Sequence, residues 1–278
     1  MTPTKKTIRA LGLALAILVQ PAGADTTQAM RTALDLAAKK DWDGALSVAP
    51  SGVGHDVIEW QRLRAGEGRL GEYEDFLQGR PDWPGLPLLH EKGEVAVARS
   101  TEPARVIAWF EAGPPETGTG AIAYVRALLS AGRAADAETE AMRAWSSLAF
   151  SPGQEQELIG LSPDGVGFVH ELRLETLLWE GRAKEAERML PRVPEDVRAV
   201  ARARLALQAQ SKGVSGLIDA VPKARKSDAG LAYDRFIWRM KKDLYDDAAD
   251  LILERSKSAE SLGRPEAWAD RRALLARY

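Results

Sequence analysis

Three histidines, His55, His90 and His170, are the side chains of this chain best suited to metal binding or to proton transfer near neutral pH. They lie far apart in the sequence, and no two of them have the spacing of paired metal ligands. His170 falls on an apolar helical stripe with Leu174 and Leu177, so we interpret it as a core histidine rather than a ligand. The sequence therefore predicts no metal site and no cofactor.

Nucleophilic chemistry has equally little support. The chain contains no cysteine, which excludes a thiolate nucleophile, a thiolate metal site and a disulfide framework. The His-Glu-x-x-His motif, the Gly-rich phosphate loop and the Gly-x-Ser-x-Gly turn are all missing from the sequence. We therefore assign no catalytic serine, cysteine or metal-activated water.

Carboxylate pairs, such as Glu155/Glu157 and Asp246/Asp247, offer the remaining route to catalysis. General acid chemistry needs a carboxyl group whose pKa is raised by burial. Because 28% of the residues are charged, we interpret these pairs as solvated helix faces and name no catalytic residue. A glycan-cleaving enzyme with an unrecognised carboxylate pair stays an open alternative.

Tryptophan side chains are a further candidate feature, because sugar rings stack on their faces. The alternative is that these large rings fill gaps where short helices cross. Trp42 lies within a predicted helix corner and Trp179 directly precedes one, which favours the packing role. The eight residues concerned are Trp42, Trp60, Trp83, Trp109, Trp145, Trp179, Trp238 and Trp268.

The elements that must position all these side chains are helices. Apolar residues recur with helical spacing, and the alternation typical of strands is nearly absent. In residues 194–209, for example, Val197, Val200 and Ala201 fall on one face of a helix. Breakers such as Gly113-Pro-Pro115 separate short helical segments. The predicted fold class is therefore all-α.

A six-residue corner recurs between these helices. Gly132-Arg-Ala-Ala-Asp-Ala137 is echoed by Gly181-Arg-Ala-Lys-Glu-Ala186, and looser copies start at Lys40, Gly68 and Asp243. Gly takes the left-handed conformation that ends a helix at little cost, and Asp tolerates it better than most residues. The Ala at the sixth position is small enough to let two helix backbones approach. Each corner therefore predicts the turn of a helical hairpin.

The spacing of the corners decides which kind of repeat is expected. Their sixth residues are separated by 28, 64, 49 and 62 positions. A tetratricopeptide array repeats every 34 residues or so. These intervals fit no single period, so we expect an irregular α-superhelix, a solenoid of short helical hairpins.

Residues 1–24 have the layout of a secretory signal peptide. Lys5, Lys6 and Arg9 form a positive leader, residues 11–19 form an apolar run, and Ala22-Gly-Ala24 supplies the small residues of a cleavage site. Cleavage after Ala24 leaves a mature chain of 254 residues with a net charge of about −5. The run is too short to span a bilayer, so we expect no transmembrane segment in the mature chain and a periplasmic location.

The distribution of charge argues against nucleic acid as a partner. Phosphate binding needs a basic stripe or patch. Arg198, Arg202 and Arg204 cluster on one predicted helix, but Glu195 and Asp196 lie beside them. We interpret this cluster as a solvated helix face.

Several longer segments resemble a known family. They are Arg80-Pro-Asp-Trp-Pro-Gly-Leu86, Leu88-Leu-His-Glu-Lys-Gly93, Leu231-Ala-Tyr-Asp-Arg-Phe-Ile-Trp-Arg-Met240, Tyr245-Asp-Asp-Ala248 and Gly263-Arg-Pro-Glu-Ala-Trp268. Together they look like the N-terminal α-superhelical region of soluble lytic murein transglycosylases. In that family the superhelix forms a ring or horseshoe before a lysozyme-like domain. A catalytic Glu of that domain cleaves the bond between N-acetylmuramic acid and N-acetylglucosamine.

The catalytic pattern of the family is a Glu-Ser pair followed by Gly-Leu-Met-Gln. Glu260-Ser261 is the one tempting dipeptide, but Leu-Gly-Arg-Pro follows it and Gly-Leu-Met-Gln occurs nowhere in the chain. We therefore reject Glu260 as catalytic. The last helix, from Pro265 to Tyr278, is expected to leave an apolar face uncovered, as in a chain truncated before its catalytic domain or split from it.

These observations predict one α-superhelical domain over residues 25–278. Its expected role is that of a scaffold module of a periplasmic lytic transglycosylase, inactive alone, which binds peptidoglycan strands or a periplasmic protein. The alternative is an exported solenoid adaptor that binds protein and has no murein role.

Overall fold

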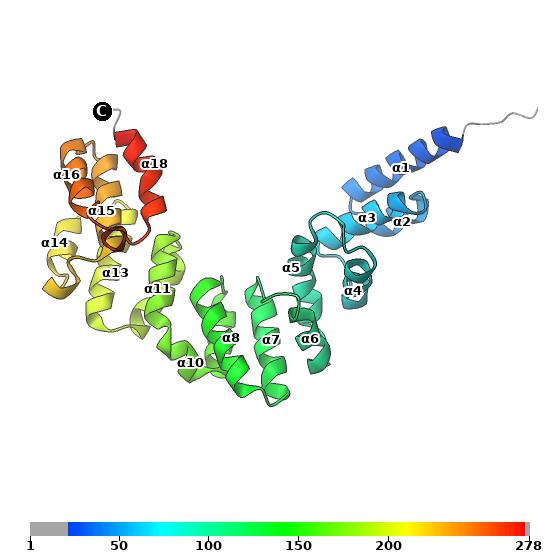
Figure 1. The fold of residues 1–278 in the computed structure, drawn as a ribbon, viewed down its shortest axis with the longest axis horizontal. Coiled ribbons are helices and arrows are strands. Elements are labelled where there is room, and N and C mark those ends of the chain that lie inside the picture. The colour runs from blue at the N-terminus through cyan, green and yellow to red at the C-terminus, as the bar shows by residue number, and fades with distance from the viewer. Residues whose placement is uncertain (1–21, 276–278) are drawn as a thin grey trace, which may run out of the picture. The chain divides into compact units, whose positions relative to one another are not determined.

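A computed structural model describes residues 22–275, and all regular structure within that range is helical (Figure 1). The predicted all-α class is confirmed. The leader and apolar run of the predicted signal peptide lie outside the described residues, while Ala22 to Ala24 form the first turn of helix α1 (Ala22–Ala38). No described helix is both long enough and apolar enough to cross a membrane.

The chain packs as two compact units that divide between Gly93 and Glu94. Unit 1 contains α1, α2 (Trp42–Val48), α3 (Val53–Arg64), α4 (Leu70–Gly79) and the start of α5 (Leu86–Val97). Its first helices bury Ala33, Ala45 and Ile58 against one another. At the start of α4, Tyr73 is fully buried and its hydroxyl donates to the Leu63 carbonyl at 2.8 Å.

Unit 2 stacks helices in chain order, so that most pack against their near neighbours in sequence (Figure 1). Its helices are α6 (Pro103–Phe110), α7 (Gly118–Ser130), α8 (Ala134–Ser147), α9 (Pro152–Leu161), α10 (Pro163–Phe168), α11 (His170–Trp179), α12 (Ala183–Met189), α13 (Glu195–Gln208), α14 (Val214–Asp219), α15 (Ala229–Lys241), α16 (Tyr245–Arg255), α17 (Ala259–Leu262) and α18 (Pro265–Leu275), with 3₁₀ turns η1 (Leu190–Arg192) and η2 (Lys223–Arg225). This order gives a solenoid-like series of helical hairpins. The finer prediction of a superhelix stays a prediction.

The predicted corners are helix C-caps of one type. After α7, Gly132 takes a φ of 74° and its N–H donates to the Leu129 carbonyl at 3.0 Å. The next N–H, of Arg133, reaches back to the Leu128 carbonyl at 2.8 Å. This pair of bonds is the Schellman motif, which satisfies carbonyls that the helix end would otherwise leave without donors.

Three of the other predicted copies repeat this geometry. Gly181 has a φ of 70°, and Lys40 and Asp243 adopt left-handed backbone at 61° and 58° although they carry side chains. The alanines at the sixth position are at most 1% exposed, which fits their role of letting helices approach; they are Ala45, Ala137, Ala186 and Ala248. The hairpin prediction is confirmed at these corners.

Left-handed backbone also occurs at positions that were not predicted. In the copy assigned to Gly68, the left-handed residue is Gly66, with a φ of 83°, and Gly68 instead packs against Leu63 and Tyr73. A further Schellman motif ends α13 at Gln210, which has a φ of 55°. Gln carries no sequence signal for left-handed backbone, so only the structure reveals this corner.

The burial of the tryptophans fits the predicted packing role, although Trp179 also lines a groove described below. None of the eight is exposed, and Trp145 and Trp268 are completely buried. In unit 1, the rings of Phe76 and Trp83 meet edge to face with centroids 5.6 Å apart.

The expectation for the last helix is wrong at Trp268. This side chain packs against Phe236 and Leu262, and its Nε1 donates to the Leu262 carbonyl at 3.0 Å. The preceding helices α15, α16 and α17 therefore cover the face that we expected to be bare. Leu274 remains 39% exposed, and Tyr278 lies outside the described residues.

We expect the glycine preference of the corners to be measurable. Replacing Lys40 by Gly should raise the free energy of unfolding by about 0.5–1 kcal/mol, because the left-handed strain of a side-chain-bearing residue is removed. Gly132→Ala should lower it by about 1 kcal/mol, and this effect is conformational because a Cβ there has no atom within 4 Å. Urea unfolding measures both changes, and equal midpoints for the two variants would contradict the assignment.

Candidate functional site

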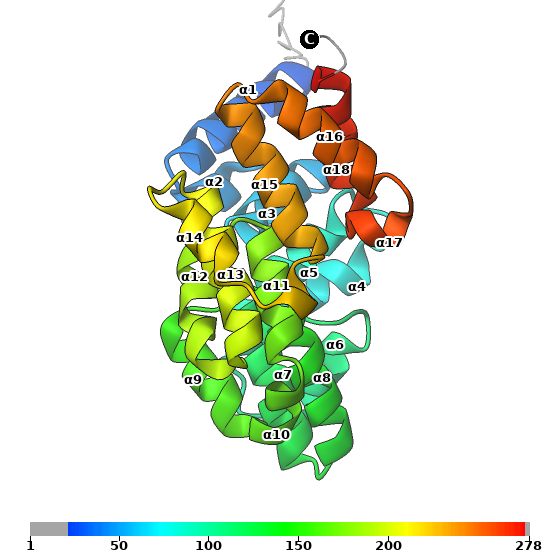
Figure 2. The same ribbon diagram turned by 90° about the vertical axis from the view of Figure 1, so that its left-hand side faces the viewer.

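Helices α11, α13 and α15 pack against one another in unit 2 (Figure 2). Arg204 of α13 is buried where the three helices meet. Arg204 is 0% exposed, and its Nε donates to Asp234 Oδ2 at 2.7 Å. Its Nη1 donates to Glu175 Oε2 at 2.8 Å. One guanidinium on α13 thereby connects a carboxylate on α11 with a carboxylate on α15.

The interpretation of the arginine cluster as a solvated face is therefore wrong for Arg204. Arg202 is exposed as expected, and Arg198 is half-buried and pairs with Glu195 at 2.8 Å. Arg204 differs because it lies four residues after Val200 and three after Ala201, on the apolar face of α13. This spacing from Val200 and Ala201 is the feature of the sequence that indicates the burial of Arg204.

The guanidinium of Arg204 approaches the backbone of α15 closely. A Cβ on Gly230 would lie 2.0 Å from Arg204 Nη1, so the close approach requires glycine there. Gln208 Nε2 donates to both Asp234 oxygens at 3.1 Å and to the Leu178 carbonyl at 2.8 Å. Burial raises the pKa of Asp234, although Arg204 and Gln208 act to lower it.

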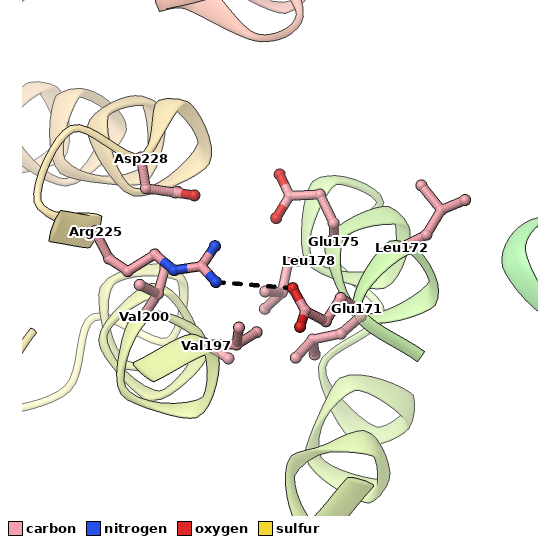
Figure 3. A pocket seen from close by; sticks show the side chains of 10 residues that line it. Glu171, Leu172, Glu175, Leu178, Val197, Val200, Arg225 and Asp228 are labelled. Carbon is pink, nitrogen blue, oxygen red and sulfur yellow. Dashed lines mark ion pairs between the residues drawn. The ribbon is translucent and has the colours of Figure 1, made fainter. Parts of the chain in front are cut away.

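A cleft opens beside this junction, between α11, α13 and η2 (Figure 3). It has a volume of about 290 Å³. Its floor is apolar and consists of Leu174, Leu178, Val197, Val200 and Ala201. Its walls carry Glu171 and Glu175 from α11, and Arg225 and Asp228 face them from the η2 side (Figure 3).

A larger groove of about 480 Å³ opens where α11 and α13 end, next to α15 and α18. Trp179 and Tyr233 line it, with their ring centroids 5.1 Å apart. Polar and charged side chains line the same groove, namely Glu180, Gln208, Asp234, Lys241 and Arg271. The groove therefore combines aromatic edges with hydrogen-bonding groups of both signs of charge.

Of the two carboxylate pairs that we interpreted as solvated, one is exposed and the other contains a buried residue. Asp246 and Asp247 are exposed, as expected. Glu155 is only 4% exposed, so the interpretation of it as part of a solvated face is wrong. It pairs with Arg173 at 3.0 Å and with Arg188 at 2.8 Å. Glu155 lies three residues before the fully buried Leu158, on the inner face of α9, which explains its burial.

Glu94 is another buried carboxylate that the sequence did not indicate. It is 0% exposed and accepts hydrogen bonds from the backbone N–H groups of Glu116 and Thr117 at 2.7 and 2.9 Å, and from the Thr117 hydroxyl. Burial raises the pKa of Glu94 against these bonds. Because its oxygens are occupied at the start of α7, we assign Glu94 a structural role.

The histidines and Glu260 stay apart from these features. His170 is half-buried and accepts a hydrogen bond from Trp145 Nε1 at 3.1 Å, which fits the structural role predicted for it. Burial lowers the pKa of His170, and the nearby Arg192 and Arg173 act in the same direction. His55 and Glu260 are exposed. Among residues 22–275, no group of His, Asp and Glu is arranged to hold a metal ion.

Comparison with protein-family models, with curated protein sequences and with solved structures gave no match to this chain. The candidate function is therefore argued from the cleft, the groove and the sequence segments described above.

Among the charged residues where α11, α13 and α15 meet, we expect substitution of Arg204 to lower the free energy of unfolding most. Arg204→Met leaves Asp234 buried without its cation, and we expect it to lower the free energy of unfolding by about 3–5 kcal/mol. Arg202→Met, on the exposed face of the same helix, should change it by less than about 0.5 kcal/mol. Urea unfolding at pH 7 compares the two variants, and similar losses would contradict the role of Arg204.

The cost of Arg204→Met should also depend on pH. Without the guanidinium, the pKa of Asp234 rises further above its value in the unfolded chain, so protonation favours the folded state. The destabilisation should be largest at pH 7 and should shrink as the pH falls through the folded-state pKa. Combining Arg204→Met with Asp234→Leu should recover most of the loss at pH 7. A loss that is independent of pH would contradict this account.

Proposed function

We propose that the chain is a binding scaffold of the cell envelope and that the groove beside α11, α13, α15 and α18 contacts peptidoglycan strands. The observation that carries this proposal is the pairing of Trp179 and Tyr233 with polar side chains along one open groove. Sugar rings pack their apolar faces against aromatic side chains, while their hydroxyls bond to carboxylates and amides.

The positive side chains at the groove extend this argument. Lys241 and Arg271 line it with exposed side chains. Peptidoglycan carries carboxylates, which are natural partners for an ammonium and a guanidinium group. A strand bound in the groove would therefore meet aromatic, neutral polar and cationic groups in turn.

The sequence segments described above make murein the first ligand to test. The segment at residues 231–240 lies in α15 and contributes Tyr233, Asp234 and Ile237 to the groove. The segment at residues 263–268 leads into α18, whose Arg271 lines the groove. The resemblance to transglycosylase superhelices and the candidate groove thus involve the same part of unit 2.

A second candidate function is that of an adaptor that binds protein. It is favoured by the other opening, the cleft beside η2, whose apolar floor and carboxylate walls differ from the groove. Leu172 at this cleft is 55% exposed. This surface chemistry suits a peptide segment better than a glycan strand.

Sedimentation with murein sacculi tests the first function. The purified protein should pellet with sacculi, whereas an adaptor without a murein role should stay in the supernatant. Lys241→Ala combined with Arg271→Ala should lower the pelleted fraction several-fold, because two cationic contacts are lost. The matched control combines Lys212→Ala with Lys257→Ala, which removes two exposed lysines away from the groove.

The same incubation also tests for chemistry. We expect no anhydro-muropeptides in the supernatant when it is analysed by mass spectrometry. Their release in proportion to the protein would contradict a purely scaffolding role. It would also reopen the alternative of a complete glycan-cleaving enzyme.

A further inference from the structure

The cleft beside η2 carries more negative charge than its surroundings neutralise. Glu171 is half-exposed, and its nearest cation, Arg225, is 3.9 Å away. Arg225 itself holds Asp196 more closely, at 2.8 Å. Arg225 therefore forms its close ion pair with Asp196, which does not line the cleft. Its contact with Glu171 is longer and weaker.

The other carboxylates of the cleft are only partly engaged. One oxygen of Asp228 caps α15 by accepting from the Leu231 N–H at 2.7 Å. Glu175 is bound by Arg204 at 2.8 Å and by the Trp179 indole N–H. The residues that line the cleft contribute three carboxylates, Glu171, Glu175 and Asp228, and one guanidinium, that of Arg225, which gives a net charge of −2. Lys223 and Lys226 are exposed on and beside the η2 turn and do not line the cleft.

The floor of the cleft is apolar but mostly covered. Leu174 is 1% exposed and Val200 is 6% exposed, while Val197 is half-buried, in a cleft of about 290 Å³. Leu172 lies at the rim of the cleft, is 55% exposed and points away from Arg225 and Val200 (Figure 3). Four residues earlier in the chain, Phe168 ends α10 with 81% of its surface exposed. An exposed apolar side chain at the rim of a cleft with an apolar floor is typical of protein-binding surfaces.

We propose that this cleft docks an extended segment of a partner protein that presents a Lys or Arg side chain next to a large apolar one. The apolar side chain lies on the floor formed by Val197, Val200 and Leu174. The basic side chain reaches Glu171 and Asp228. The volume accommodates one or two side chains, so the partner contributes a short segment to the cleft rather than a folded face.

Charge complementarity selects this occupant over others. An anionic ligand, such as a phosphate group or an acidic peptide, would meet a net charge of the same sign. A glycan strand would find no aromatic side chain among the residues that line the cleft. A basic and apolar segment gains both contacts, and its binding should weaken as salt screens the carboxylates.

Selection from a random dodecapeptide library displayed on phage tests the proposal, with the full chain as the immobilised target. The enriched peptides should carry a Lys or Arg within two positions of a Leu, Ile, Phe or Met. A synthetic peptide of the most enriched sequence should bind Glu171→Gln and Val197→Ser each at least 10-fold more weakly than the unmodified protein. The matched controls are Asp246→Asn and Leu253→Ser, which alter an exposed carboxylate and an exposed leucine on α16.

Three results would overturn the proposal. One is a selection in which no peptide is enriched over a blank support. Another is a set of enriched peptides without basic residues, and the third is equal binding to the cleft variants and to the α16 controls. Circular dichroism and urea unfolding verify that both cleft variants are folded before binding is compared.

This inference is independent of the murein-binding proposal. Glu171→Gln should leave sedimentation with sacculi unchanged, because Glu171 does not line the groove. Lys241→Ala with Arg271→Ala should leave peptide binding unchanged, because neither residue lines the cleft. The two proposals are therefore tested by different variants, and the failure of one leaves the other unaffected.

Discussion

The ion pairs of Arg204 are the interaction on which the candidate site depends. A guanidinium that is completely buried must keep its carboxylates, because leaving either charge alone costs several kcal/mol. Arg204 therefore fixes Asp234 of α15 and Glu175 of α11 against α13. Pairs of this kind add little net stability over apolar packing, but they define which surfaces meet. The cleft and the groove lie on either side of this contact and share Leu178.

The helix corners provide hydrogen-bond donors for the carbonyl groups at the helix ends. Short helices expose many carbonyls at their ends, and each must find a donor. The Schellman bonds after α1, α7, α11 and α15 supply donors from the chain itself, so the next helix can start within a few residues and fold back. The buried alanine that follows lets the paired helices approach closely. Hairpins built in this way stack without strands or disulfides.

Buried polar groups occur at several junctions between helices of unit 2. Glu155 with Arg173 and Arg188, and Glu94 with Thr117, each satisfy a carboxylate within the protein. Their oxygens are engaged in structure, whereas Glu171 and one oxygen of Asp228 face open space. This difference separates the carboxylates that hold the fold together from those available to a ligand. Both proposed binding surfaces are lined by residues of α11 and α13, two of the helices that Arg204 connects.

The sequence by itself determined the local structure of this protein. Helical periodicity fixed the all-α class, and Gly132, Gly181 and Asp243 fixed where hairpins turn, because left-handed backbone depends on the residue at the turn. Only the tertiary structure decided which charges are buried, because burial depends on what packs against a helix face. Arg204 and Arg202 have the same side chain on one helix and opposite environments. The partners Glu175 and Asp234 lie about 30 residues away in either direction, and no local pattern joins them.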